Sequence, residues 1–391
     1  MMRVSSRKLW LAAVAVIGLS LLVFALNFNV GSLISSQQKK NDELIAEQMA
    51  YHVGTLAYLY GYPIVDMHKQ MHNETHRLPA EQQVYAPVNR LYRYPDIVGP
   101  DTAGNLRAPN NDTLYYSGWF DISAEPLSRF TPGQRPEKPP EKTADAIDPL
   151  SSLAFFEVLN ESLKSLPARS SEAALMSQFD LIGVGRHSEF KIEGLSPGAR
   201  RGLERALADG EAIVQAATQR TIPNYNGWMI SKQIGRYGFS YMHRAAVARG
   251  GYGNLPEESL YPAMVFDADG ELLDGGRRYQ LHFAAGELPP VNGFWSLAAY
   301  RLNDLQLEDN AIQRYSIGDR TRALSYNADG SLTLTLQHAG RRTIEPIGCR
   351  FPRVRLCSSC DCMNPPPPHW EMITYCPNWK SSVTKGKSEQ L

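Results

Sequence analysis

The strongest constraint on what this chain can fold into is an apolar run near its N-terminus. Trp10 to Leu26 is a stretch of seventeen residues without a charged side chain. A helix over this stretch would have no polar face, so it does not suit the surface of a globular domain. Its length is at the short limit for a membrane-spanning helix and is long for the core of a signal peptide. We therefore expect residues 1–36 to be a signal peptide or a membrane anchor.

Residues around this run indicate its orientation in the membrane and whether it could be cleaved or retained. Arg3, Arg7 and Lys8 precede it, and basic residues in that place keep the N-terminus in the cytoplasm. Val23-Phe24-Ala25 has small or slender residues at the two positions that signal peptidase reads, so cleavage near Ala25 would secrete the chain. If it is retained, the segment tethers the globular part to the cell membrane, in the periplasm or outside the cell. Whether the segment is cleaved or retained, we expect the rest of the chain to be exported.

A proline-rich interruption divides the exported part. Residues 129–148 read RFTPGQRPEKPPEKTADAID, which holds too few apolar side chains to order itself, and this predicts a linker or exposed loop. Residues 37–128 before it combine a polar spacer, a helix ending near Tyr60 and a mixed texture of turns and short strands. Residues 149–344 after it begin with two amphipathic patterns, centred on Leu153–Leu166 and Leu203–Ala217.

The end of this second region has the pattern of a β-sheet. Ser331 to Gln337 alternates apolar and polar residues with a period of two, and Arg278–Phe283 and Phe294–Tyr300 are further candidate strands. Asp267–Gly270 and Asn327–Gly330 are turn sequences beside them; the first lacks the spacing of a calcium loop. The predicted fold class is α+β, with an N-terminal α+β segment followed by helices and a C-terminal antiparallel β-sandwich.

The most unusual polar stretch is PNNDTLYY, from Pro109 to Tyr116. Adjacent Asn and Asp side chains form turns by bonding their own backbone. One interpretation is a turn that faces a ligand, where amides, a carboxylate and phenols converge. The other is a buried polar turn that fixes the path between strands. The candidate ligand-binding residues are Asn110, Asn111, Asp112, Thr113, Tyr115 and Tyr116.

Three histidines offer a candidate metal site. His68, His72 and His76 lie four residues apart in DMHKQMHNETHR, so on a helix they would share one face. A His pair at this spacing can hold a transition metal, and His68 with His72 is the candidate pair. The alternative is a solvated, partly aromatic helix face.

Several stretches together resemble a bacterial exported family of two parts, known as domains of unknown function 1254 and 1214. The first part is matched by AYLYGYPIV at Ala57–Val65 and APNNDTLYYSGWFDIS at Ala108–Ser123; the second by NGWMI at Asn226–Ile230, YGFSYMHRAAVARGGYG at Tyr237–Gly253, LPPVNGFWSLAAY at Leu288–Tyr300, RYSIGD at Arg314–Asp319 and YNADGSLTL at Tyr326–Leu334. The resemblance implies an α+β first part, here internally shortened, and a β-sandwich second part. It implies no catalytic residues.

The C-terminal tail departs from that resemblance. All five cysteines lie between Cys349 and Cys376, and residues 345–391 lack the family's closing strand. With the codons read one frame over, Cys360 to Asn364 permit R-L-Y-E, which is part of the family's ending. We hypothesise a single-base frameshift between about Gln337 and Glu345. The alternative is that Cys357, Cys360 and Cys362 form a zinc or disulfide cluster.

Charge and motifs limit the function. Lys and Arg total 40 and Asp and Glu total 40, so nothing indicates a nucleic-acid partner. The leading hypothesis is a membrane-tethered binding or accessory module of the cell envelope for a small-molecule or envelope ligand. One alternative is a hydrolase or metal-assisted enzyme, with His72 or His76 and Asp112 moving protons. Another is a non-functional copy. The sequence names no cofactor and no oligomeric state.

Overall fold

A computed structural model describes most of the chain between residues 6 and 385. The residues outside that description are 1–5, 77–85, 95, 104–105, 122–147, 221, 226, 302–304, 311, 323, 338–347, 351–355, 364–383 and 386–391. The side chains of residues 6–18, 21–32, 76, 219–220, 348–350, 356–363 and 384–385 are also outside it. Nearly all of the predicted linker and much of the C-terminal tail therefore fall outside the described residues.

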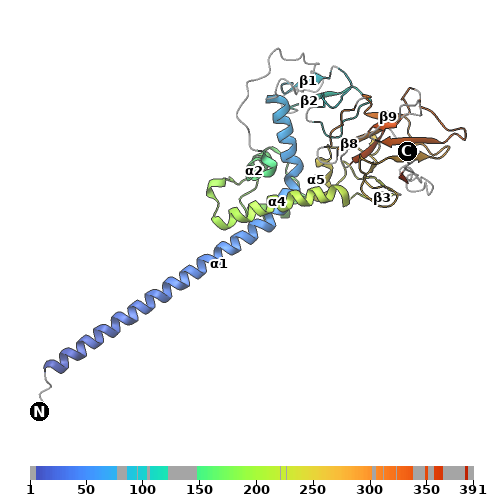
Figure 1. Ribbon diagram of the computed structural model, residues 1–391. Coiled ribbons are helices and arrows are strands. Elements are labelled where there is room, and N and C mark those ends of the chain that lie inside the picture. The colour runs from blue at the N-terminus through green and yellow to red at the C-terminus, as the bar shows by residue number, and fades with distance from the viewer. Residues whose placement is uncertain are drawn as a thin grey trace. The chain divides into compact units, whose positions relative to one another are not determined.

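Helix α1 is a single helix that runs from Ser6 to His76 (Figure 1). It includes the predicted polar spacer, and it does not end near Tyr60: that prediction was wrong, because Pro63 lies inside the helix. Proline removes one backbone hydrogen bond and crowds the preceding turn. A side chain from elsewhere supplies a donor in the turn before Pro63, since Arg244 donates to the Tyr60 carbonyl at 2.6 Å.

Among the described residues, no helix carries an apolar stretch long enough to cross a membrane. The side chains of Trp10 to Leu26 lie almost wholly outside the described part.

The chain forms two compact units, and each combines two separate stretches. The first contains residues 1–58 and 151–209, and the second contains residues 59–150 and 210–391. The boundaries therefore fall within the helices α1 and α4 (Pro197–Arg220).

The first unit is helical. Its core brings the N-terminal part of α1 together with α2 (Ala154–Ser165), α3 (Ala173–Asp180), the short 3-10 turns η3 (Ser170–Glu172) and η4 (Ile192–Gly194), and the first half of α4. The helices predicted around Leu153 and Leu203 are confirmed as α2 and α4. Helices α1 and α4 approach closely at Gly202, because a Cβ there would overlap the Glu47 carbonyl oxygen and lie 2.8 Å from the Ala50 Cβ.

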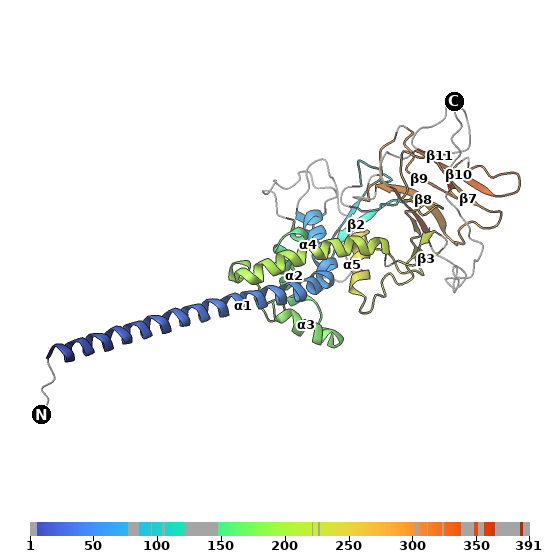
Figure 2. The ribbon, with the colours of Figure 1, turned by 60° about the horizontal axis from the view of Figure 1, so that its bottom comes forward.

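The second unit contains two sheets around one core. One sheet has the strand order β11-β10-β7-β13, formed by Gly348–Arg350, Leu332–Gln337, Tyr279–Phe283 and Thr384–Lys385. Figure 2 shows β7, β10 and β11 side by side. The predicted strands are confirmed, and β10 buries every second residue, as its alternating sequence requires. The pairing of β10 with β11 is parallel, unlike the antiparallel pairing we expected.

The other sheet has seven strands. Its order is β3-β4-β6-β12-β8-β9, with β5 also paired to β12; the bounds are Asn224–Tyr225, Trp228–Met229, Ala263–Met264, Leu356–Met363, Phe294–Arg301, Ser316–Gly318 and, for β5, Ser259–Leu260. One hydrophobic core draws on both sheets, with Tyr279 and Leu334 from the first and Trp228, Trp295 and Ile317 from the second. The α+β class is therefore confirmed.

Strand β12 belongs to the C-terminal tail and is paired on both sides. The arginines and the four prolines of the tail favour an unpaired sheet edge there, yet β12 lies inside the sheet between β8 on one side and β5 and β6 on the other. The physical reason is that Leu356–Met363 itself contains no proline, so all of its backbone groups can join the ladder. Charge in the flanking residues does not prevent backbone pairing.

A small hairpin completes the second unit. Strands β1 (Arg90–Arg93) and β2 (Tyr116–Trp119) are antiparallel and lie over a cluster that includes Tyr92, Tyr94 and Val98. The 3-10 helix η2 (Pro149–Ser151) precedes α2, and helix α5 (Tyr241–Arg249) lies between β4 and β5 in the sequence.

Candidate functional site

The second unit contains a cavity of about 920 Å³. This volume is in the range of pockets that hold small organic molecules. Its walls come from α1, the loop before β2, the end of α4, the segment from β4 to β6 with α5 between them, and β8. Segments far apart in the sequence thus form one concave surface.

The cavity wall is aromatic and aliphatic, with scattered polar groups. The described residues that line it include five tyrosines (Tyr115, Tyr116, Tyr252, Tyr261 and Tyr300), aliphatic side chains such as Met229, Ile234 and Val265, and neutral polar ones such as Gln70, Asn110, Ser231 and Asn254. Only two of the described residues that line it are charged, Arg107 and Arg249. Such a surface suits a largely apolar molecule with a few polar groups.

The structure divides the predicted ligand-binding turn between two places. Asn110, Thr113, Tyr115 and Tyr116 line the cavity. Asn111 and Asp112 do not, because their side chains accept hydrogen bonds from the Ser316 hydroxyl of β9 at 3.4 and 3.3 Å. Ligand binding by any of these six residues stays a prediction.

Hydrogen bonds hold this turn in one conformation. The Asn110 side chain accepts from the Asp112 N–H at 2.6 Å, which is the local bonding that Asn favours in turns. The Tyr115 hydroxyl accepts from the Asn110 N–H at 2.8 Å. Tyr300 of β8 donates its hydroxyl to the Pro109 carbonyl at 3.0 Å. The cavity wall is thus rigid at this point before any ligand binds.

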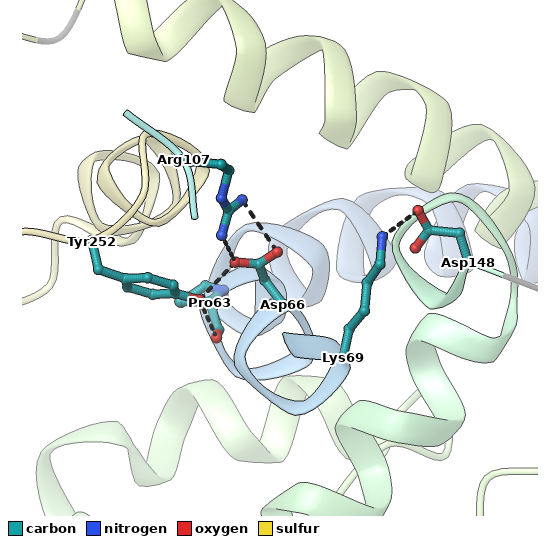
Figure 3. A network of polar contacts seen from close by, with 6 residues as sticks. All are labelled: Pro63, Asp66, Lys69, Arg107, Asp148 and Tyr252. Carbon is teal, nitrogen blue, oxygen red and sulfur yellow. Dashed lines mark hydrogen bonds and ion pairs between the residues drawn. The ribbon is translucent and has the colours of Figure 1, made fainter. Parts of the chain in front are cut away.

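Beside the cavity, Arg107 forms a two-point ion pair with Asp66 of α1 (Figure 3). Its two terminal nitrogens lie 3.3 and 2.5 Å from the two carboxylate oxygens. The Arg107 and Asp66 side chains are 20% and 7% exposed. A planar guanidinium on a carboxylate is the geometry of a strong, charge-assisted pair. Asp66 therefore neutralises Arg107 at the wall of the cavity.

Tyr252 completes this network from the loop after α5. Its hydroxyl donates to the same Asp66 carboxylate at 2.7 Å, and the Arg107 guanidinium lies 5.7 Å from the centre of its ring. The loop reaches this position through Gly251, whose φ is +110° and whose Cβ, if present, would lie 2.7 Å from the Arg107 carbonyl oxygen. Only glycine fits there without strain. The Gly250–Gly251 pair thus places Tyr252 against Asp66.

Burial and charge shift the pKa values of the network. Burial, followed by the charge of Asp66, raises the pKa of Tyr252 far above its usual value and that of Tyr62 to about 12. Burial lowers the pKa of Arg107, but the charge of Asp66 and its hydrogen bonds outweigh this effect and raise it. At neutral pH the two tyrosines are therefore neutral and the guanidinium is charged.

A second polar pair lies at the wall of the cavity. The Ser231 hydroxyl, which lines the cavity, is 2.9 Å from Nε2 of His243 on α5. Both residues are buried, with 4% and 7% exposure. Burial lowers the pKa of His243 below its usual 6.5, so the ring is neutral at pH 7.

The predicted metal pair lies outside the cavity lining. His68 and His72 are exposed on α1, four residues apart as expected on a helix. Within the described part of the chain, no three His, Cys, Asp or Glu side chains gather as metal ligands would. A metal held by His68 and His72 stays a prediction.

Sequence reasoning missed the partners of Asp66 and the Ser231–His243 pair. Arg107 lies 41 residues and Tyr252 lies 186 residues from Asp66 in the sequence, so no local pattern links them to it. The sequence did hold one signal, the Gly250-Gly251 pair directly before Tyr252, because consecutive glycines often mark a close backbone approach. Ser231 follows NGWMI without any recognisable nucleophile motif.

Comparison with known proteins identifies one domain. Residues 258–345 match the family described as "Protein of unknown function (DUF1214)". This confirms the second part of the resemblance for that region. The first part, and the two-part architecture, stay predictions. No curated protein matches the chain.

Two solved structures are similar to this chain. The VPA0106 protein from Vibrio parahaemolyticus is 16% identical with a TM-score of 0.44, and the match covers 86% of this chain and 100% of that one. A putative uncharacterised protein from Burkholderia cenocepacia is 14% identical with a TM-score of 0.26, covering 46% of this chain and 44% of that one.

Proposed function

We propose that this protein is a binding or accessory module that holds a small, largely apolar aromatic molecule with an acidic group. The observation that carries the proposal is the cavity of about 920 Å³ with its five tyrosines. Aromatic rings supply a large contact area, and the wall is fixed by the hydrogen bonds around Pro109 and Asn110. A rigid wall lowers the entropy lost on binding.

Arg249 is the reason to expect an acidic group on the ligand. It lies in the last turn of α5 and lines the cavity. Among the described residues, no Asp or Glu pairs with it, whereas Arg107 is neutralised by Asp66. A partly buried cation without a counter-charge favours an anionic partner such as a carboxylate.

Two fluorescent probes with the same aromatic body test this proposal. N-phenyl-1-naphthylamine is uncharged, and 8-anilinonaphthalene-1-sulfonate adds one anionic group to it. We expect both to bind the full-length chain with one site. In Arg249→Gln the sulfonate probe should bind about tenfold more weakly, since tenfold corresponds to about 1.4 kcal/mol, and the neutral probe should be unaffected. Arg277→Gln is the matched control, because Arg277 is half exposed beside Asp274 and does not line the cavity.

Tyr116→Ala locates the probes in the cavity. Tyr116 lines the cavity and yet is 54% exposed, so it lies at the mouth and its loss should leave the fold intact. Both probes should bind about fivefold to tenfold more weakly, because a large aromatic contact is removed. Binding of neither probe to the unmodified chain would overturn the proposal. If Arg249→Gln weakened the binding of both probes equally, the ligand would not need an acidic group, and that part of the proposal would be wrong.

We also propose that the module is exported and held at the membrane by its N-terminal segment. The support is the sequence of residues 1–26, with basic residues before an uncharged apolar run. Cell fractionation with protease digestion of intact cells or spheroplasts should place the globular part on the far side of the cytoplasmic membrane. Recovery in the cytoplasmic fraction would contradict export. N-terminal sequencing of the recovered chain distinguishes cleavage near Ala25 from a retained anchor.

A further inference from the structure

Ser231 and His243 have the geometry of a nucleophile and its base. The Ser231 Oγ accepts a hydrogen bond from the Gln233 N–H at 3.4 Å and lies 2.9 Å from His243 Nε2. In the tautomer of His243 that carries its proton on Nδ1, Nε2 accepts the Ser231 hydroxyl hydrogen. Ser231 is also one of the residues that line the cavity.

The imidazole is held in place and kept neutral. His243 lies in the first turn of α5, and the Tyr237 ring packs against it edge-on with the ring centres 5.7 Å apart. Burial lowers the pKa of His243, so at pH 7 Nε2 can accept a proton. A fixed neutral base beside a serine hydroxyl is the requirement for activating that hydroxyl.

We propose that Ser231 and His243 hydrolyse a carboxylic ester bound in the cavity, with Ser231 as nucleophile and His243 as general base. This inference rests on the proposed function, because it names the substrate class of the same cavity. The Ser231 Oγ attacks the ester carbonyl carbon while Nε2 takes the hydroxyl proton. The acyl–oxygen bond breaks, and the imidazolium returns the proton to the departing alcohol. Water then attacks the acyl carbon and gives a proton to Nε2. The bond between the acyl carbon and Oγ breaks, and Nε2 returns the proton to Oγ, which forms the acid and free Ser231.

The surroundings favour an ester over an amide. Among the described residues, no carboxylate forms an ion pair with His243, so its imidazolium lacks the third group that assists in a full triad. A phenolate or alkoxide departs with less help from an acid than an amine does. The five tyrosines of the wall match an ester with an aromatic or apolar body.

An alkyl fluorophosphonate and 4-nitrophenyl butyrate test the inference on the full-length chain. The phosphonate should form one adduct per chain, located on Ser231 by mass spectrometry, with fluoride released. Ser231→Ala should abolish the adduct and the release of 4-nitrophenol. His243→Gln should slow both at least about tenfold, since general-base catalysis contributes more than that. Ser259→Ala is the control, because Ser259 is a buried serine outside the cavity lining and its loss should leave labelling unchanged.

Binding of N-phenyl-1-naphthylamine separates the two proposals. If the probe binds but no adduct forms on Ser231, the hydrolytic inference is overturned and the binding function stands. If the probe does not bind, both the proposed binding function and the hydrolytic inference are wrong. Ser231→Cys guards against misfolding of the alanine variant: it keeps a nucleophile and should release one equivalent of 4-nitrophenol in a burst. An adduct on another serine, or labelling that persists in Ser231→Ala, would also overturn the inference.

Discussion

The Arg107 guanidinium contacts both oxygens of the Asp66 carboxylate and joins the loop before β2 to helix α1. Tyr252 donates to the same carboxylate from the loop after α5. One acidic side chain therefore connects three segments of the second unit directly behind the cavity wall.

Removing that charge should destabilise the protein strongly. In Asp66→Asn the mostly buried Arg107 cation loses its counter-charge, and such a loss typically lowers the free energy of unfolding by about 3 kcal/mol or more. Urea denaturation followed by tryptophan fluorescence measures the effect. Asp148→Asn is the matched control: its partner Lys69 is 33% exposed and Asp148 is 44% exposed, so we expect a loss below about 1 kcal/mol. Equal effects of the two variants would contradict the role assigned to Asp66.

Glu74 of α1 should make stability depend on pH. Its buried carboxylate accepts hydrogen bonds from the Trp119 indole N–H at 2.7 Å and the Ser117 hydroxyl at 3.2 Å. Burial nevertheless raises its pKa above the usual 4.5, so the folded state favours the protonated form. Its contribution to stability is therefore complete below pH 4.5 and is lost as the pH rises through the raised pKa.

Glu74→Gln tests this by removing the charge and keeping the shape. Relative to the unmodified chain, the variant should gain stability as the pH rises above 4.5, with the free energy of unfolding measured in urea at each pH. Glu258→Gln, at an exposed position, should show no such change. A difference between Glu74→Gln and the unmodified chain that does not vary with pH would exclude the effect.

The close approach of α1 and α4 predicts a penalty for a single methyl group. Alanine favours a helix over glycine by about 1 kcal/mol, yet in Gly202→Ala the new Cβ would overlap the Glu47 carbonyl oxygen. Overpacking typically costs about 1–3 kcal/mol, so the variant should be less stable despite its better helix propensity. Gly194→Ala is the control, because nothing lies within 4 Å of a Cβ at that position. Thermal unfolding of both variants measures the penalty. A stabilised Gly202→Ala would contradict the prediction and show that the two helices can move apart.

Periodicity in the sequence predicted the elements whose packing is regular, and missed those that depend on distant contacts. Strand β10 and helices α2 and α4 follow directly from the spacing of their apolar residues. Pro63 predicts a helix end, but Arg244, 184 residues from Tyr60, supplies a donor at this point. The cavity could not be predicted for the same reason, because it forms only where segments far apart in the chain meet. Local sequence could indicate that Asn110 and Tyr116 were unusual, and not which surface they would line.

The position of β12 gives the frameshift hypothesis a structural test. Strand β12 pairs with β8 over eight residues, Leu356–Met363, opposite Phe294–Arg301. Its sequence, LCSSCDCM, contains no β-branched or aromatic residue, which is unusual for a strand inside a sheet. Read one frame over, the same eight positions can encode VLIVRLYE, which contains four strand-favouring residues: two Val, one Ile and one Tyr. The cysteines would then be by-products of the frame.

Two of these changes, Cys357→Leu and Ser359→Val, should therefore stabilise the second unit. Residue 357 lies opposite Tyr300 and residue 359 opposite Ala298, both buried, so Cys357→Leu and Ser359→Val place apolar side chains beside a buried surface. Cross-strand pairs contribute roughly 0.2–1 kcal/mol each, so these two substitutions together should add about 1 kcal/mol to the free energy of unfolding. Replacing Cys357, Cys360 and Cys362 with serine should have no effect. Loss of stability or of bound zinc in that serine variant would favour a cysteine cluster, and resequencing the codons for residues 330–391 from independent DNA would show whether a base is missing or extra.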